Sequence, residues 1–401
     1  MRPAPAPQPE HRIDDAALAP DAIRSLRGSK IREIANAGMH DRDMLAFWFG
    51  EPDVVTPQFI RDAATASLAR GETFYAQNFG IPELREAIAG YATGLHGPTS
   101  DANVAVTASG MSALMLAVQA LVAPGDRVVV VTPLWPNLVE IPKILRADVC
   151  VPLVFGRGGW TLDLDRLLAA LVPGTRALMI NSPNNPTGWT IEAAAQRALA
   201  AHCERLGIWI VADDVYERLY FGDAPCAPSF LDVAHRGARV VSTNSFSKAW
   251  LMTGWRLGFL VAPETLMPEI GKLIEYNTSC SPVFVQRAGV AAMTQGEPTV
   301  AAVRERLRHA RDRLLAALGA LPGVEAASPA GAMYAFFRVA GLSDSMAFCR
   351  ALVREAKLGL APGSAFGPEG EGFVRWCFAA TDERLDDGIA RLAAFLALRS
   401  G

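Results

Sequence analysis

The sequence lacks any strong excess of charge and any long apolar run. Its 401 residues carry 38 Lys and Arg against 41 Asp and Glu, which gives a formal net charge of −3. Binding to nucleic acid or to an anionic membrane usually shifts that balance towards Lys and Arg. No segment approaches the ~20 consecutive apolar residues that cross a bilayer. We therefore expect a small-molecule partner, with neither nucleic acid nor a membrane.

The cysteines show no spacing that is typical of a metal site. There is no C-x-x-C pair, and no histidine lies at ligand spacing from a cysteine. Several lie in apolar runs, as reduced core cysteines of a cytoplasmic protein do. We expect no metal and a cytoplasmic location. The six cysteines are Cys150, Cys203, Cys226, Cys280, Cys349 and Cys377.

The N-terminal segment MRPAPAPQPEHRIDDAALAP is rich in Pro and Ala and lacks the apolar core of a signal peptide. We expect residues 1–28 to form a flexible arm. The sequence also lacks a repeat of fixed period, which excludes solenoids and propellers.

Short β-rich runs alternate with helical patterns between about residues 100 and 265. This alternation predicts an α/β fold, a mostly parallel sheet with helices on both faces. In such three-layer folds the site lies at the carboxyl ends of the strands. The runs are VAVTA, RVVVVTP, VCVPLVF, RALMINS, IWIVADD, RVVSTNS and RLGFLVAP.

The length of the chain and its 51% apolar composition predict two domains, because single cores stop growing at roughly 250–300 residues. After about residue 295 the pattern changes to a long charged helix, strands around AMYAFFRV and GFVRWCFAA, and a final helix from Asp382. We expect a large domain over residues 51–294 and a smaller α+β C-terminal domain over residues 295–401. Residues 29–50 are expected to cross over and join the small domain.

One lysine has an unusual setting in the string TNSFSKAWLMTGWRLGF. Lys248 follows a β-branched strand, with Ser245 three residues before it and Arg256 eight residues after it. Taken alone, S-x-S-K is also typical of a surface lysine in a serine-rich loop. The whole string resembles the class I, fold-type I aminotransferases, which depend on pyridoxal 5′-phosphate (PLP), and the resemblance runs from about Ser29 to Leu396. It implies a Schiff base on Lys248 and a cofactor phosphate held by Ser245 and Arg256.

Two acidic residues follow the apolar run IWIV in VADDVYERLYF. Alone, Asp213 and Asp214 are also typical of helix caps. In the enzymes that the chain resembles, the first of these carboxylates pairs with the pyridine nitrogen of PLP, and the tyrosine at Tyr216 binds the phenolic oxygen. A carboxylate there keeps the nitrogen protonated, so that the ring acts as an electron sink. The resemblance therefore implies catalytic roles for Lys248, Asp213 and Tyr216.

Three further segments extend the cofactor site by resemblance. Asn185, in NSPNNPTGWT, is implied to bind the phenolic oxygen, although the string alone predicts a tight turn. Ser109, Gly110 and Met111 lie where a strand leads into a helix, whose free amides suit a phosphate, with an ordinary helix cap as the alternative. Trp135, in TPLWPNL, is implied to stack on the ring of the cofactor, and an ordinary core tryptophan is the alternative.

Two segments bear on the partner subunit and the substrate. Tyr75, in ETFYAQNFGIPELREAI, matches a family segment that crosses a dimer interface and reaches the partner's phosphate, which implies a homodimer. A local aromatic anchor is the alternative. Arg375, in GFVRWCFAATDERL, needs an anionic partner or solvent among its apolar neighbours. The resemblance assigns it, with Asn185 and Gly50 of FWFGEPD, to the substrate α-carboxylate.

The constellation implies transfer of an amino group between an amino acid and a 2-oxo acid. Met111 occupies the position where some dicarboxylate-specific relatives have a lysine, and IEYNTSCSP lacks the arginine that others supply. Trp48 and Phe49 add apolar surface near the expected mouth. We therefore expect a neutral or aromatic amino acid as substrate. Aspartate transamination is the alternative, with a cation from the N-terminal segment supplying the missing charge.

Two other activities are alternatives, and the sequence alone separates the first of them poorly from transamination. β-Lyases and other enzymes of α-carbon chemistry use the same constellation, because PLP supplies the electronics. A non-catalytic ligand-sensing regulator is a remote alternative, since the residues before Ser29 show no basic helix-turn-helix pattern.

Overall fold

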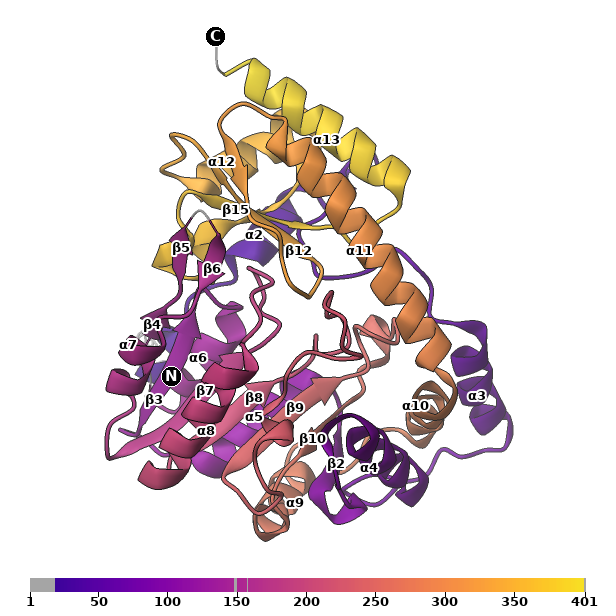
Figure 1. Ribbon diagram of the computed structural model, residues 1–401. Helices are drawn as coiled ribbons and strands as arrows, with labels where there is room; N and C mark the ends of the chain where they lie inside the picture. The colour runs from indigo at the N-terminus through magenta and orange to yellow at the C-terminus, as the bar shows by residue number, and fades with distance from the viewer. Residues whose placement is uncertain (1–18, 148–149, 157, 400–401) are drawn as a thin grey trace, which may run out of the picture.

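A seven-stranded sheet organises the larger part of the chain in the computed structural model, which describes residues 19–147, 150–156 and 158–399 (Figure 1). The strand order is β2-β10-β9-β8-β7-β3-β4. β10 is antiparallel to both of its neighbours, and the other adjacent pairs are parallel. The strands are β2 (Val104–Thr107), β3 (Arg127–Thr132), β4 (Cys150–Pro152), β7 (Thr175–Asn181), β8 (Trp209–Asp213), β9 (Val240–Ser245) and β10 (Gly258–Val261).

The α/β fold that the alternating pattern predicted is confirmed, and each of the seven β-rich runs contributes one strand. β2, β9 and β10 are buried on both faces. β2 and β10 are accordingly apolar almost throughout, whereas β9 ends in the buried polar residues 242–245, which lead to the cavity. Within β3, Val128 and Val130 contribute to one core cluster and Val129 and Val131 to the other, as the two-residue period of a strand requires.

Helices cover both faces of this sheet. On one face lie α5 (Gly110–Leu121), α6 (Pro136–Ile144) and α9 (Met267–Glu275). The other core cluster includes the buried faces of α3 (Gln58–Ala69), α4 (Pro82–His96), α7 (Leu164–Ala170), α8 (Ala193–Leu206) and α10 (Val283–Gln295). A hairpin of β5 (Val154–Gly156) and β6 (Gly159–Thr161) lies beside this second core cluster.

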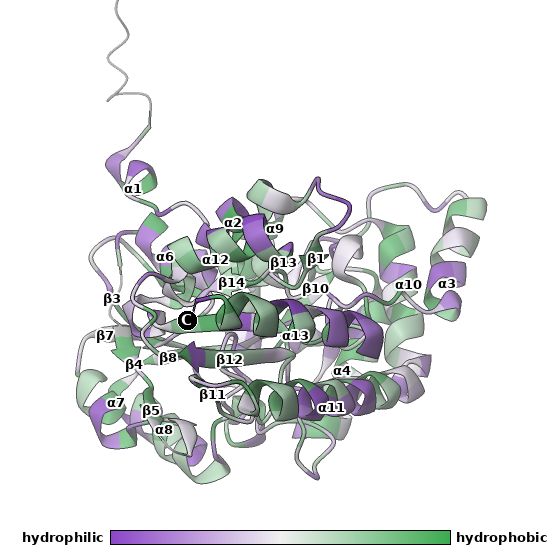
Figure 2. Ribbon diagram, turned by 90° about the horizontal axis from the view of Figure 1, so that it is seen from above, coloured by the Kyte–Doolittle hydropathy of each residue, from purple (hydrophilic) through white to green (hydrophobic). Residues whose placement is uncertain are grey.

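A second, four-stranded sheet lies above the first in Figure 1, in the order β11-β12-β15-β14. Its strands are β11 (Val324–Ala326), β12 (Tyr334–Val339), β14 (Ala361–Pro362) and β15 (Phe373–Cys377), and all adjacent pairs are antiparallel. Two long helices, α11 (Glu297–Gly319) and α13 (Asp382–Ala397), lie beside β12 and carry hydrophilic as well as hydrophobic residues (Figure 2).

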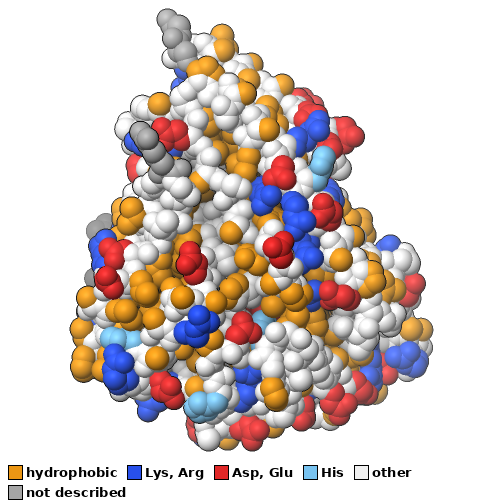
Figure 3. All heavy atoms as spheres, viewed as in Figure 1, with side chains coloured by type: hydrophobic (Ala, Val, Ile, Leu, Met, Phe, Trp, Pro, Cys, Tyr) orange, Lys and Arg blue, Asp and Glu red, His pale blue; other side chains and the backbone are white. Residues whose placement is uncertain are grey.

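Charged side chains of both signs gather along α11 on the surface (Figure 3). Arg308 pairs with Glu305 at 2.9 Å on the same helix, and Arg313 pairs with Asp386 of α13. The buried residues of α11, such as Val303, Leu307 and Leu314, recur at helical spacing on the opposite face. The long charged helix is thus amphipathic.

The N-terminal segment contacts the second sheet region. After a four-residue helix α1 (Asp21–Arg24), α2 (Lys30–Gly38) begins at Ser29, whose hydroxyl accepts a hydrogen bond from the amide of Arg32. β1 (Leu45–Ala46) then pairs in parallel with β13 (Leu358–Gly359), which follows α12 (Ser345–Ala351). Most of the expected flexible arm lies outside the described residues.

Two expectations about the chain concern what it lacks. Among the described residues, no helix is long and apolar enough to cross a membrane. None of the five cysteines whose side chains are described forms a disulfide, and Cys150 lies outside that set.

Candidate active site

A cavity of about 610 Å³ lies where the carboxyl ends of the large sheet face the second sheet. β7, β8 and β9 each end beside it, as the parallel topology requires. Of the thirteen candidate residues for cofactor and substrate binding, eleven line this cavity. They are Gly50, Gly110, Met111, Trp135, Asn185, Asp213, Tyr216, Ser245, Lys248, Arg256 and Arg375.

Two candidate residues lie outside the cavity lining. Ser109 is buried and caps α5, because its hydroxyl accepts a hydrogen bond from the Ser112 amide at 3.0 Å. Tyr75 is 91% exposed on the surface of this single chain. The Ser109 hydroxyl thus accepts from the helix and keeps its O–H as a donor, and Tyr75 does not contribute to its own chain's cavity.

Lys248 follows β9 after a short polar turn. The hydroxyl of Ser245 accepts a hydrogen bond from the Ser247 amide at 3.1 Å, which holds that turn in place. The Lys248 amine donates to the carbonyl of Gly50 and lies 5.9 Å from the centre of the Tyr216 ring. Burial lowers the pKa of Lys248 to about 8. Its neutral amine, the form that acts as nucleophile or base, is therefore far more populated near neutral pH than that of an ordinary lysine.

The two adjacent aspartates at the end of β8 point to different surroundings. Asp213 faces the cavity and accepts only a long hydrogen bond, 3.4 Å, from the Val215 amide among the described residues. Burial raises the pKa of Asp213 to about 7. Asp214 points away and accepts hydrogen bonds from the hydroxyls of Ser242 at 2.6 Å and Ser229 at 3.1 Å. Asp213 is thus a buried carboxylate that lacks a strong donor, which suits a cationic N–H group of a ligand.

An asparagine pair joins β7 to its neighbours. Asn181, the last residue of β7, donates to the Asp213 carbonyl at 2.9 Å and accepts from the Asn185 amide at 2.8 Å. The side-chain oxygen of Asn185 in turn accepts from Arg375 at 2.9 Å. Asn181 lines the cavity as well, and its sequence position at the start of NSPNNP was the signal that could have identified it.

The N-terminus of α5 meets β9 and β10 with no room for extra side chains. A Cβ atom at Gly258 would lie 2.4 Å from the Gly110 nitrogen, and one at Gly110 would lie 3.0 Å from the Cβ of Ser245. The amides that begin this 12-residue helix therefore approach the Ser245 hydroxyl closely. Arg256 lines the same cavity and donates to the Thr253 carbonyl at 2.7 Å. Helix amides, a hydroxyl and a guanidinium together suit a phosphate group.

Arg375 is 2% exposed and lies in the middle of the second sheet. Its guanidinium stacks on the rings of Tyr334 and Phe366, at 4.4 and 4.8 Å from their centres. It donates to the Asn185 side chain and to the Trp48 carbonyl, and its Nε has no hydrogen-bond partner. No carboxylate of the described residues pairs with it, so its buried charge suits an anionic ligand.

Tyr334 is a site residue that the sequence did not reveal, because its segment was interpreted only as a strand. Its hydroxyl lies 2.7 Å from the hydroxyl of Tyr216. A Cβ atom at Gly50 would lie 1.8 Å from that same Tyr334 oxygen, so the chain needs glycine there. Tyr334 therefore joins the second sheet to Tyr216 by a hydrogen bond, and it lies directly against Gly50.

The cavity wall nearest the N-terminus contains a cation that the sequence did not reveal. Arg32 of α2 lines the cavity and lies over the ring of Phe49, 4.8 Å from its centre. No carboxylate among the described residues pairs with it. Trp48, in contrast, is buried in the core against Gly359 and is absent from the cavity lining. The expectation that Trp48 shapes the mouth is therefore wrong, whereas Phe49 does line it.

Comparison with known proteins identifies the family. The aminotransferase class I and II family matches residues 42–392. An aspartate aminotransferase of Pyrococcus horikoshii is 35% identical over 93% of this chain and 95% of its own length. Two solved structures align closely. One is an N-succinyldiaminopimelate aminotransferase of Mycobacterium tuberculosis, which is 29% identical with a TM-score of 0.89 and covers 94% of this chain and 99% of its own. The other is an aromatic aminotransferase of P. horikoshii, which is 30% identical with a TM-score of 0.84 and covers 92% of this chain and 99% of its own.

The chain belongs to the aminotransferase class I and II family and has the fold-type I architecture. The expected activity class, a transaminase that depends on PLP, is thereby confirmed. The relatives named above act on different amino acids, so family membership leaves the substrate open.

Proposed function

We propose that this aminotransferase holds PLP covalently on Lys248, with the phosphate group at Ser245, Arg256 and the amides of Gly110 and Met111. The observation that carries this assignment is the convergence of a lysine of lowered pKa and a phosphate cradle on one cavity. Gly258 admits no side chain, because a Cβ atom there would meet the backbone of Ser109 and Gly110, and the start of α5 therefore lies directly against β10.

The remaining cofactor contacts follow from the cavity lining. Asp213 would receive the pyridine N–H, and this cation would return the carboxylate to its ionised form. Tyr216 and Asn185 would bind the phenolic oxygen, and Trp135 would cover one face of the ring. When bound, PLP supplies an electron sink for the charge that develops at the substrate α-carbon. Asp213 serves that chemistry by keeping the ring nitrogen protonated.

Substrate binding and proton movement use the opposite wall of the cavity. Arg375 would bind the α-carboxylate through its two terminal nitrogens, beside Asn185 and the backbone of Gly50. The Lys248 amine would be the base that takes up and holds the proton of the substrate α-carbon. Its pKa near 8 matches a base that works at neutral pH.

We propose a neutral or aromatic amino acid as the donor. Met111 lines the cavity where a lysine would meet a distal carboxylate, and the segment 274–282 supplies no cation. Phe49 and Trp135 add aromatic surface, which favours an apolar side chain at roughly 25 cal/mol per Å² buried.

Arg32 supports a second candidate, an acidic substrate such as aspartate. Its guanidinium lies at the cavity with only the Phe49 ring beneath it. A distal carboxylate that reached it would gain a charge-assisted hydrogen bond worth about 1.5–3 kcal/mol.

The two candidates differ in the half-reaction with single amino acids. We expect the cofactor spectrum to change faster with phenylalanine, leucine or methionine than with aspartate or glutamate, measured as kcat/KM. Arg32→Met should change the ratio little, as should Arg42→Met, a control at an exposed position outside the cavity. The opposite result would be a higher kcat/KM for aspartate or glutamate than for the apolar amino acids. If Arg32→Met reverses that preference and Arg42→Met does not, the substrate is acidic instead.

We also propose a homodimer in which Tyr75 enters the partner's cavity. Phe74 and Tyr75 are 84% and 91% exposed in the single chain, and Tyr276 is 90% exposed. Large aromatic side chains so exposed are typical of an interface. Mixing Tyr75→Ala chains with Lys248→Ala chains should restore activity, because each heterodimer has one complete site. A monomer that stays fully active on dilution contradicts the proposal.

A further inference from the structure

A buried cluster of charged residues lies behind the strands that carry the active site. His96, the last residue of α4, is 8% exposed. Its Nδ1 lies 2.7 Å from the Asp232 carboxylate and its Nε2 lies 3.0 Å from the Glu217 carboxylate. One imidazole ring thus joins two carboxylates from different segments of the chain.

The Glu217 end of this cluster reaches both strand-end segments of the cavity. Glu217 directly follows Tyr216 in the chain, and its second oxygen accepts a hydrogen bond from Asn244 of β9 at 2.7 Å. Asn244 in turn accepts from the amide of Ser245 at 2.8 Å. Tyr216 and Ser245 both line the active-site cavity. His96 is therefore connected to Ser245 by a chain of hydrogen bonds through Glu217 and Asn244, and to Tyr216 through the backbone that joins it to Glu217.

The protonation state of the ring follows from its surroundings. Burial alone would lower the pKa of His96, but the charges of Glu217 and Asp232 outweigh it and raise the pKa to about 10. The ring is therefore an imidazolium that donates from both nitrogens at neutral pH. Without it, Glu217 would be a buried carboxylate close to Asp214, whose pKa burial and Glu217 already raise to about 7. Such an unpaired buried charge has to move or take up a proton.

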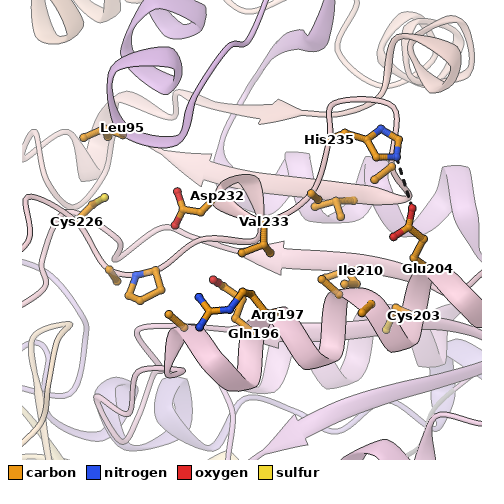
Figure 4. A pocket seen from close by; sticks show the side chains of 18 of the residues that line it. Leu95, Gln196, Arg197, Cys203, Glu204, Ile210, Cys226, Asp232, Val233 and His235 are labelled. Carbon is orange, nitrogen blue, oxygen red and sulfur yellow. Dashed lines mark ion pairs between the residues drawn. The ribbon is translucent and has the colours of Figure 1, made fainter.

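The Asp232 end of the cluster is more open. Asp232 borders a second cavity of about 690 Å³, where its carboxylate lies across from Gln196 and Arg197 of α8 (Figure 4). Its side chain is 35% exposed, whereas that of Glu217 is 6% exposed. Water screens the Asp232 contact, so the contact to Glu217 is the stronger of the two.

We propose that His96 is a positioning residue, which holds the Tyr216 and Ser245 segments in place for the cofactor through Glu217 and Asn244. The proposal rests on the cofactor site described above. His96 touches neither cofactor nor substrate and acts only through Glu217. Loss of the imidazolium lets Glu217 move, and the two segments then lose their fixed separation.

The test is a double-mutant cycle on cofactor binding, with His96→Gln, Glu217→Gln and the double variant. We expect each single change to raise the dissociation constant of PLP about tenfold, and the double change to add little further. The visible circular dichroism of bound PLP, which reports the orientation of its ring, should weaken in all three variants. His202→Gln is the matched control, because His202 is a half-buried histidine on α8 that bonds the Leu171 carbonyl at 2.8 Å.

Several outcomes contradict the proposal. If His96→Gln lowers the Tm of the cofactor-free protein but leaves the PLP affinity and the dichroism unchanged, the residue has a structural role alone. Losses that add fully in the double variant would exclude action through Glu217. If the His96→Gln variant does not fold, the dissociation constant of PLP is measured on the Asp232→Asn variant instead. A rise of about two- to threefold in the dissociation constant supports the proposal, and an unchanged constant overturns it. Failure of the wild-type chain to link PLP to Lys248 would instead refute the proposed function.

Discussion

The two walls of the active-site cavity are built in different ways. On the proposed cofactor side, several residues lie at the end of a strand of the large sheet, as Asn181, Asp213 and Ser245 do. On the substrate side, the contacts join distant parts of the chain. Arg375 donates to Trp48 across 327 positions, and to Asn185 across 190.

Because of this difference, one wall can specify the reaction while the other specifies the substrate. The cofactor side follows from strand order alone, so the same reaction can be kept wherever the sheet is kept. The substrate side depends on how α2 and the second sheet are placed against the large sheet, and small changes in that placement alter the pocket. The relatives share the fold yet carry names of different substrates, as this division of labour predicts.

The largest effect is expected on the cofactor side, from Asp213→Asn. The change keeps the shape but removes the charge opposite the ring nitrogen, a contact of roughly 4 kcal/mol at an effective dielectric of ~20. The turnover number should fall about a thousandfold. Asp214→Asn is the matched control, because Asp214 points away to Ser229 and Ser242, and it should cost much less. Equal losses in the two variants would contradict the assignment.

A smaller effect is expected on the substrate side, from Arg375→Lys. The charge remains, but the two-pronged contact with the α-carboxylate is lost. We expect KM for the amino acid to rise about 10- to 100-fold, with less change in PLP affinity. Arg338→Lys on the neighbouring strand β12 is the control, since Arg338 is exposed and outside the cavity. A variant with unchanged KM and impaired PLP binding would place Arg375 on the cofactor side instead.

The pH dependence of cofactor uptake sharpens the comparison further. Burial lowers the pKa of Lys248 to about 8, so its amine is neutral above that pH instead of only above the usual value of 10.5. The rate at which the cofactor-free protein takes up PLP should therefore rise from pH 7 through pH 8 and level off by about pH 9. Stopped-flow absorbance measures this rate. A rate that keeps rising towards pH 10 would show an unperturbed lysine.

The sequence predicted the cofactor wall better than the substrate wall, for a physical reason. Lys248, Asp213 and Asn185 follow recognisable strands at fixed spacing, so topology alone brings them together. Tyr334 looked like any strand residue, and only its long-range contacts, the hydrogen bond to Tyr216 and the close approach of Gly50, place it in the site. Arg32 lies one residue after the buried Ile31 of an amphipathic helix, and helical periodicity does not show which neighbour such a residue faces.

The most direct test of the account is to identify the residue that carries the cofactor. Borohydride reduction of the PLP-loaded protein, followed by peptide mapping, should place the label on Lys248 alone, and Lys248→Ala should bind PLP without a covalent link. A label on any other lysine, or an unchanged label in Lys248→Ala, would contradict the central claim.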